Sequence, residues 1–312
     1  MRITQPAFAP GKNRLKAALH VHTTRSDGHG TPEEVLRLYA SKGFDVVALT
    51  DHNVYNTENF APETGLLVVP GMERNFEMPD SVWPICHTFH TVALGRSAER
   101  GNKFVHDQRF EFHGPVADQF ALQPHLDEIH QAGNVTFLCH PEWSGTPARD
   151  FDRLQGHFGM EIWNSGCAMD NDQDTNAAYW DEILGQDKRW SGLAVDDGHP
   201  MIQHGNGWVV VNAEKNVDAV IDALEAGAFY SSCGPEIYNF YVEDGVAYIE
   251  CSPCVMAGFA FSRKPSALTW DHENASVTST HTHFTIPDSL KYVRGIVKDA
   301  QGRRAWTNPI WL

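Results

Sequence analysis

The sequence of 312 residues predicts an α/β barrel followed by a small all-β module. Short apolar strands alternate with amphipathic helices up to Gly234-Pro235, and no helical pattern follows this point. Such an alternation indicates a parallel sheet covered by helices, and about seven strand–helix units are compatible with a barrel. We therefore assign residues 1–235 to the barrel and residues 236–312 to a small β-sandwich-like module.

The first strand and helix establish the alternation. Residues 15–23 are an apolar strand, and Thr31, Pro32 and Glu34 then give the N-cap, first-turn proline and capping box of a helix that ends at Gly43. Further strands are expected at residues 45–50, 65–70, 87–95, 134–139, 160–163, 192–195, 208–212 and 229–232, and helices at 122–132, 174–184 and 217–226. In the β module, strands are expected at residues 238–242, 246–250, 259–261, 277–285 and 292–297.

The charge balance argues against nucleic acid as a partner. Acidic residues outnumber basic ones by 40 to 24, so a basic surface that neutralises phosphates is not expected. No apolar run approaches the roughly 18 residues of a membrane span, so no membrane is expected either. The chain begins without a signal-peptide pattern and contains 6 cysteines, from which we expect free thiols and a cytoplasmic location. The single C-x-x-C motif, Cys251-Ser-Pro-Cys254, is only a weak redox or zinc signal.

Ligand-type side chains stand where the expected strands end. His20 and His22 lie two residues apart on the first strand and point to one face, and Asp27 follows in the next loop. Ligands of parallel α/β proteins bind at the carboxyl ends of strands, and imidazole with carboxylate is a donor set that Zn, Mn or Fe select. The other strand-end candidates are Asp51, His52, Glu73, His87, His90, His140, Asp197 and His199. The pair His281-Thr-His283 has the same spacing as the first pair, but no strand-end carboxylate accompanies it, so we interpret it as part of an exposed strand.

Several of these motifs resemble those of PHP domains (polymerase and histidinol phosphatase), which belong to the wider amidohydrolase-like group. The resemblance begins with His20-Val-His-Thr-Thr-Arg-Ser-Asp27-Gly and Gly43-Phe-Asp-Val-Val-Ala-Leu-Thr-Asp-His52-Asn. It continues, in the family's order, with Gly71-Met-Glu73, His90-Thr-Val-Ala-Leu-Gly95, Cys139-His140-Pro141 and Asp197-Gly-His199. It spans roughly residues 15–235 and implies a distorted seven-stranded β/α barrel. The β module, which ends in Arg304-Ala-Trp-Thr-Asn-Pro-Ile-Trp-Leu312, looks more weakly like that of a PHP subgroup related to carbamate-insecticide hydrolases.

The resemblance implies a site for two or three divalent metal ions. One ion would take His20, His22, Glu73 and Asp197, a second would share Glu73 and add His90 and His140, and a third would take Asp27, His52 and His199. His87 is the alternative to His90, which we prefer for its spacing to Leu94-Gly95. Asp51 and Asp196 are expected to orient ligating imidazoles.

The resemblance also favours a phosphoesterase that uses a metal-activated hydroxide on a small phosphorylated substrate. We expect Glu73 to bridge metals, His199 to serve in proton transfer, and Arg25 and Trp143 to contact substrate. The β module leaves hydrolysis of a carboxylic ester, amide or carbamate open, with Trp83, Trp143 and Trp163 lining the pocket. A non-catalytic metal-binding role is a further alternative. The oligomeric state and the role of the β module stay open.

Overall fold

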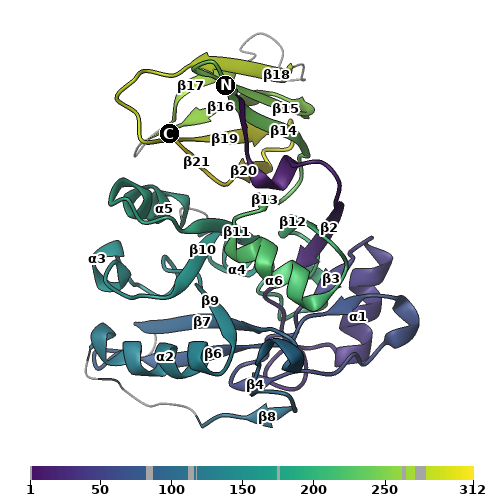
Figure 1. The fold of residues 1–312 in the computed structure, drawn as a ribbon. Helices are drawn as coiled ribbons and strands as arrows, with labels where there is room; N and C mark the ends of the chain where they lie inside the picture. Colours follow the sequence, from purple (N-terminus) through teal and green to yellow (C-terminus); the bar gives the residue numbers. More distant parts are fainter. Residues whose placement is uncertain are drawn as a thin grey trace.

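The computed structural model describes residues 2–81, 87–111, 116, 118–173, 176–261, 265–270 and 279–312. It is a mixed α/β protein with more strand than helix (Figure 1). The helices are α1 (Pro32–Ser41), α2 (Gln123–Gln131), α3 (Ala148–Phe151), α4 (Ser165–Asn171), α5 (Asn176–Gly185) and α6 (Val217–Glu225). None of the helices in these ranges is long and apolar enough to cross a membrane.

The strands fall into two main sheets and a separate antiparallel sheet near the chain's ends. One sheet has the order β11 (Ser191–Val195), β10 (His157–Asn164), β9 (Asn134–Leu138), β7 (Thr88–Gly95) and β6 (Gly71–Glu77). The largest sheet has the order β17 (Pro265–Trp270), β16 (Met256–Ala260), β19 (Tyr292–Lys298), β20 (Arg304–Thr307), β13 (Phe229–Ser232), β12 (Trp208–Ala213), β2 (Asn13–Ala18), β3 (Val46–Val47) and β5 (Leu67–Val68). The antiparallel sheet joins β1 (Arg2–Thr4), β14 (Ile237–Glu243), β15 (Val246–Cys254) and β18 (Ser279–Thr285). Shorter strands are β4 (Val54–Tyr55), β8 (Gln108–Arg109) and β21 (Ile310–Trp311).

The expected seven-stranded barrel does not appear as one closed sheet in the described residues. The strands assigned to it divide between the two main sheets, which approach each other through isolated bridges at Val21–Gly198 and His52–Glu73. β3 and β5 contain only two residues each, so the backbone pairing is too short to continue around the barrel. The bridges lie beside predicted ligands, so the two sheets meet where the candidate site is.

Glu73 does not lie at the end of the third expected strand. That strand is reduced to β5, and the chain begins a separate strand, β6, at Gly71. β6 runs antiparallel to β7, with Asn75 opposite His90. A side chain added at Gly71 would lie 2.9 Å from the carbonyl oxygen of Ala93, so this entry to β6 requires glycine.

The helix α1 forms for the reasons its sequence predicts. The Thr31 hydroxyl accepts the backbone N–H of Glu34, whose carboxylate accepts the N–H of Thr31, so both halves of the capping box are confirmed. The helix then buries Val35 and Tyr39 against the part of the core that β2 and β3 form. This packing fixes α1 behind the first strand, whose end carries His20 and His22.

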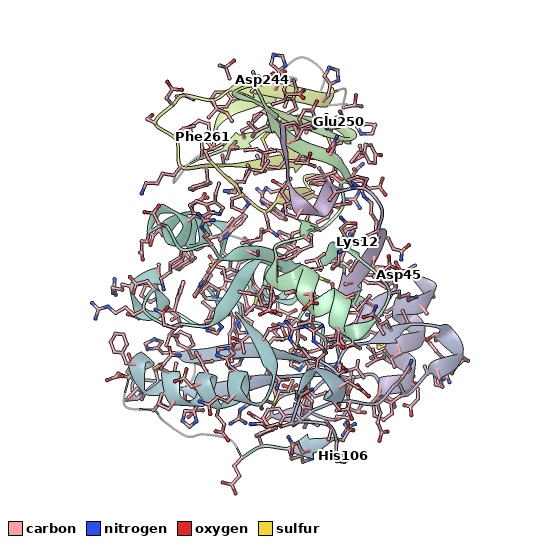
Figure 2. The ribbon with its side chains drawn as sticks, in the orientation of Figure 1. Lys12, Asp45, His106, Asp244, Glu250 and Phe261 are labelled. Atoms are coloured by element: carbon pink, nitrogen blue, oxygen red, sulfur yellow. The ribbon has the colours of Figure 1, made fainter. Side chains whose placement is uncertain are left out.

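Strand pairing continues across the predicted boundary at residue 235. β13 pairs with β20, and β1 at the start of the chain pairs with β14. The buried Arg294 on β19 also contacts Asp181 on α5 at 2.7 Å. The β strands after residue 236 gather at one end of the molecule, where both termini lie (Figure 1), while His106 marks the opposite end (Figure 2). The separation of residues 236–312 as a module of their own stays a prediction.

Candidate metal centre

The nine predicted ligands come together at one place, between the two main sheets. The backbone N–H of Asp197 donates to the carbonyl of His20 at 3.0 Å, and the N–H of His22 donates to the carbonyl of Gly198 at 3.2 Å. These bonds join the loop after β11 to the end of β2. Gly28 returns close to the same backbone, and a Cβ there would lie 2.5 Å from the carbonyl carbon of His22. A glycine is therefore required for Asp27 to reach the site.

Four of the ligands form a compact, buried cage, which we call the inner cage: His20, His22, Glu73 and Asp197. The Nε2 atoms of the two imidazoles lie 3.1 Å apart, and each lies 3.3 Å from Glu73 Oε2 and 3.0–3.2 Å from Asp197 Oδ1. Metal–ligand bonds of about 2.0–2.1 Å in tetrahedral geometry would separate neighbouring donors by about 3.3 Å. Glu73 Oε2 is buried among three imidazole nitrogens within 3.3 Å, from His20, His22 and His52, yet none is aligned for a hydrogen bond to it, which is costly without a cation. The donor set and its spacing therefore fit a metal ion.

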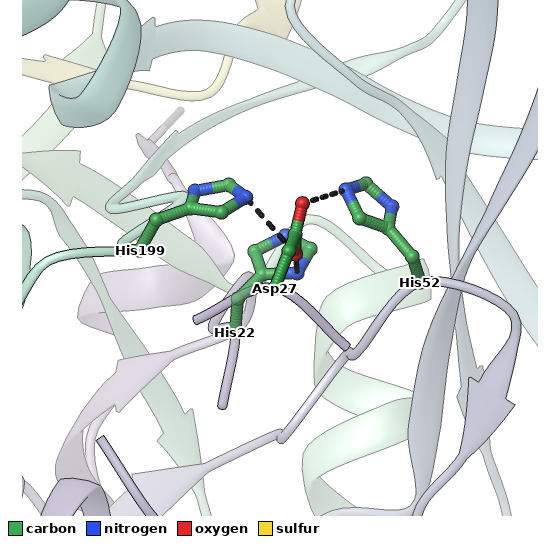
Figure 3. A group of neighbouring side chains, drawn as sticks. All are labelled: His22, Asp27, His52 and His199. Atoms are coloured by element: carbon green, nitrogen blue, oxygen red, sulfur yellow. Dashed lines mark ion pairs between the residues drawn. The ribbon is translucent and has the colours of Figure 1, made fainter. Parts of the chain in front are cut away.

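Asp27 organises a second, more open group with His22, His52 and His199 (Figure 3). Its carboxylate oxygens lie 3.4 Å from His199 Nε2 and 3.6 Å from both His22 Nδ1 and His52 Nε2. His22 thus faces the inner cage through Nε2 and this group through Nδ1. The structure brings together the three ligands that the resemblance assigns to the third metal and adds His22 to them.

Glu73 also faces the remaining predicted pair. Its Oε1 lies 2.9 Å from His90 Nδ1 and 3.3 Å from His140 Nε2. The donor atoms of His90 and His140 do not belong to one group. One group consists of His52, Glu73 and His90, and a neighbouring group consists of Glu73, Cys139 and His140. His87 points elsewhere and contacts the carboxylate of Asp80 at 2.6 Å. The structure therefore places His90, and not His87, beside the other candidates.

Two of the ligands have backbone conformations that non-glycine residues rarely adopt. His140 has φ of 21° and Asp197 has φ of 49°. Such strain persists only where the surrounding structure holds it, and it concentrates at functional sites. Here the Glu161 carboxylate accepts the N–H of His140, while Asn164 donates to Asp197 Oδ2 at 3.0 Å. Glu161 and Asn164 thus hold the two strained residues in place.

The electrostatics of the metal-free site are those of imidazolium ions around carboxylates. Burial would raise the pKa of Glu73, but His52, His20 and His90 hold it well below its ordinary value. Burial would lower the pKa of His52, but Glu73 and Asp27 raise it to about 9. His90 behaves differently, because burial dominates and lowers its pKa to about 4. Protons therefore occupy several nitrogens that a metal ion would need.

These shifts predict how metal binding depends on pH. The raised pKa of His52 stabilises the metal-free fold fully below the unfolded value of about 6.5, and this contribution is lost as pH rises through about 9. Metal binding requires neutral imidazole and so strengthens over the same range. We expect chelator-buffered zinc or manganese to raise Tm more at pH 9 than at pH 6.5, measured by thermal unfolding. An increment in Tm that does not change with pH would contradict this.

Glu161 is a site residue that the sequence analysis missed. It is fully buried on β10, and its Oε1 lies 2.6 Å from His20 Nδ1. Its Oε2 accepts the N–H of His140 and the amide of Asn164, both at 2.9 Å. The sequence did contain a signal for Glu161, because its carboxylate stands between two apolar residues, Met160 and Ile162, of a buried strand. Cys139 was missed as well, but burial raises the pKa of its thiol, which makes it a poor ligand.

Asp51 and Asp196 act on loops rather than on imidazoles, contrary to our expectation. Asp51 accepts the backbone N–H groups of Thr23 and Ser26, which shapes the loop that carries Asp27. Asp196 accepts the Tyr39 hydroxyl at 2.7 Å and three successive N–H groups of residues 205–207. A carboxylate that does orient an imidazole is Glu161, through its contact with His20 Nδ1.

A cavity of about 260 Å³ opens above the cages. It is lined by Asp27, His52, His90, His140, Trp143, Gly166, Cys167, Asp170, Asn171, Asp197 and His199. Trp143 is thus placed as predicted, with its ring centroid 5.0 Å from that of His140. Arg25 is not among the lining residues, because its guanidinium pairs with Asp107. Trp163 lines a different pocket, and Trp83 lies outside the described residues.

Comparison with known proteins supports one family assignment. Residues 18–133 match the PHP domain family, and no curated protein matches the sequence. The structure is similar to a Bacteroides vulgatus two-domain protein containing a predicted PHP-like metal-dependent phosphoesterase (TM-score 0.49, 15% identity, 96% of each chain covered). It is also similar to an amidohydrolase from Chromobacterium violaceum with bound sulfate and no metal (TM-score 0.42, 16% identity, 59% of this chain and 88% of the other). These likenesses are weak and decide nothing about the reaction. The match to the PHP domain family is confined to residues 18–133, the segment that carries His20, His22, Asp27, His52, Glu73 and His90.

Proposed function

We propose that this protein is a metal-dependent hydrolase and that its reaction is the hydrolysis of a phosphoester. The observation that carries the proposal is the convergence of His, Asp and Glu donors, at metal-ligand spacing, beneath an open cavity. The inner cage, the Asp27 group and the donors around Glu73 Oε1 would hold two or three divalent ions. Zn, Mn and Fe all accept these donors. Bound there, such ions would supply Lewis acidity and a water of lowered pKa.

Glu73 is central to this proposal because its two oxygens face different groups of imidazoles. Oε2 faces the inner cage, and Oε1 faces His90 and His140. One carboxylate can therefore serve two neighbouring cation sites. Adjacent cations suit a phosphoryl centre, because they can stabilise both the attacking and the leaving oxygen. This arrangement is the reason for favouring phosphoester hydrolysis.

His199 is placed to hold or move a proton at the cavity wall. Its Nδ1 lies 3.0 Å from the carbonyl oxygen of Asp197, which leaves Nε2 as the exchanging nitrogen. Nε2 lies 3.4 Å from Asp27. Ligation and proton transfer would use this same nitrogen, so His199 performs only one of these roles in a given step. We propose proton transfer to the leaving oxygen when Nε2 carries the proton.

A second candidate is hydrolysis of a carboxylic ester, amide or carbamate at the same site. The lining residues of the cavity include no Lys or Arg, so among them only bound cations and protonated imidazoles would attract a phosphate dianion. Trp143 and Cys167 instead offer apolar surface to a neutral substrate. The lining thus supports the neutral substrate, whereas the arrangement around Glu73 supports the phosphoester.

The two candidates are separated by parallel assays of nitrophenyl phosphate and nitrophenyl acetate with zinc- or manganese-loaded protein. Faster turnover of the phosphate, lost in His140→Ala, is the expected result. Turnover of the acetate alone, also lost in His140→Ala, would replace the proposal with ester hydrolysis. Turnover that persists in His140→Ala would place the reaction elsewhere.

Asp170 offers a finer test of substrate charge. It is an exposed carboxylate of the cavity wall and accepts a hydrogen bond from Gln203 at 2.8 Å. Asp170→Asn should lower KM for nitrophenyl phosphate about 2-fold to 5-fold by removing repulsion, and leave KM for nitrophenyl acetate unchanged. Asp172→Asn, which removes an exposed carboxylate outside the cavity lining, is the matched control. Equal effects of the two substitutions on both substrates would contradict a phosphate bound beside Asp170.

A further inference from the structure

A second pocket lies against a different face of α4 from the cavity above the ligands. It has a volume of about 520 Å³ and is lined by Lys16, Lys42, Trp163, Ser165, Met169, Gly205, Asn206, Trp208, Cys233 and Arg303, which we call the lysine–tryptophan pocket. On α4, Ser165 and Met169 face this pocket, whereas Gly166 and Asp170 face the cavity above the ligands. Residues four apart share a helix face, so the two pockets use different faces of α4.

The lining of this pocket is cationic in a strongly acidic protein. The chain has a formal net charge of -16, yet the pocket is lined by three basic residues and no Asp or Glu. In the described ranges, no carboxylate lies within 4.0 Å of the Nζ atom of Lys16 or Lys42. The nearby Asp45 carboxylate is engaged by the backbone N–H of Lys16 and by Lys215 Nζ, and Asp45 lies at the edge of the fold (Figure 2). Two ammonium groups that form no direct ion pair with a described carboxylate therefore share one pocket.

Each ammonium is held in place by the fold. Lys16 on β2 is half-buried, with its Nζ 4.1 Å from the ring centroids of Phe44 and Trp208 and 3.4 Å from the carbonyl oxygen of Lys42. Burial lowers its pKa, the carboxylates of Asp196 and Asp45 act against this, and the neighbouring charge of Lys42 acts with it. Lys42 Nζ donates to the carbonyl of His204. An anion in the pocket would relieve both the burial cost and the mutual repulsion of the two lysines.

The other walls are aromatic and apolar. Trp163 and Trp208 are partly exposed, and the Met169 residue on α4 is 49% exposed. Trp163 is fixed by a hydrogen bond from its indole N–H to the Ser165 hydroxyl at 3.0 Å. Flat aromatic side chains beside fixed cations are suited to a planar ring that bears a negative group. The volume is in the range of small-molecule sites.

We propose that the lysine–tryptophan pocket binds a small aromatic anion, a planar ring with one carboxylate, sulfonate or phosphate group. The anionic group lies between Lys16 and Lys42, and the ring lies against Trp163 and Trp208. Arg303 contributes less, because its guanidinium already pairs with Asp299 at 2.8 Å. This binding is separate from hydrolysis at the metal centre.

The test is calorimetric titration of the full-length, metal-loaded protein with naphthalene-2-sulfonate, which has no bond to hydrolyse, and with the neutral 2-naphthalenemethanol. We expect saturable binding of the sulfonate and roughly 10-fold weaker binding of the neutral probe, because a charge-assisted contact is lost. Lys42→Met, at an exposed residue, should weaken sulfonate binding roughly 10-fold. Lys16→Met should do the same and Lys16→Arg should restore it, while Lys103→Met, at an exposed lysine outside the pocket, is the matched control.

Three results would overturn the proposal. Equal sulfonate affinity in Lys42→Met, Lys16→Met and the Lys103→Met control would show that these lysines do not hold the anion. Equal affinity for the sulfonate and the neutral probe would reduce the pocket to an apolar surface. Loss of sulfonate binding in Glu73→Gln, with the lysine variants unchanged, would place the anion at the metal centre.

Discussion

Replacing Glu73 with Ala is expected to remove both bound metal and hydrolytic activity while the protein stays folded. Glu73 is fully buried, and its oxygens lie within 3.3 Å of five imidazole nitrogens, from His20, His22, His52, His90 and His140. Without this carboxylate, cations placed among these imidazoles lose their shared negative ligand. Since loss of a group that only orients a ligand costs 10-fold to 100-fold, we expect metal affinity and kcat/KM to fall by at least about 100-fold.

The measurements are metal content after gel filtration, turnover, and circular dichroism. Glu73→Gln keeps the shape of the side chain and removes the charge, so it should also lose metal and thereby separates a charge effect from a cavity effect. Glu77→Gln, on the same strand but outside the ligand groups, is the matched control. Full metal occupancy with normal turnover in Glu73→Ala would remove Glu73 from the site.

The candidate ligands could be found in the sequence because they follow a local rule. His20 and His22 follow β2 and His140 follows β9, strands of the two main sheets whose carboxyl ends meet at the site. The spacing of His20 and His22 needs no long-range information. Glu161 broke this rule, because it lies within β10 rather than at its end. Its role depends on contacts with His20 and His140, which only the folded chain reveals.

The fold was less predictable than the site wherever pairing is non-local. The alternation of strands and helices predicted α1, α2 and α6 close to their observed bounds, but it could not show that β6 and β7 pair antiparallel. Nor could it show that β20, from the end of the chain, pairs with β13. Such partners lie far apart in sequence, and the apolar pattern of a strand does not specify its neighbour.

The two His-x-His pairs show how context separates a ligand pair from a chance one. His281 and His283 lie on β18, which pairs with β15 so that they stand opposite Glu250 and Tyr248. Glu250 lies in the β module, at the end of the molecule opposite His106 (Figure 2). In the part of the chain that the structure describes, no group of three metal donors includes either histidine. The strand-end carboxylates, and not the spacing alone, mark the first pair as ligands.

Glu161→Gln is expected to weaken metal binding 10-fold to 100-fold, the usual cost of losing a group that orients a ligand. The carboxylate accepts through both oxygens, one toward His20 Nδ1 and the other toward the His140 N–H and the Asn164 amide. An amide accepts through one oxygen only, so its NH₂ group must face a donor. Either His20 loses its orienting partner, or the strained backbone at His140 loses its anchor.

Because Glu161 acts through His20 and His140, we regard it as a positioning residue. Raising the metal concentration should therefore restore most of kcat in Glu161→Gln, whereas Glu73→Ala should not recover. Metal affinity by chelator competition and turnover at increasing metal concentration give the two readouts, with Glu182→Gln, on the exposed face of α5, as the matched control. Wild-type metal affinity in Glu161→Gln would show that the contact with His20 does not set the direction of its Nε2 lone pair. A loss of kcat that metal cannot restore would instead give Glu161 a direct role in the reaction.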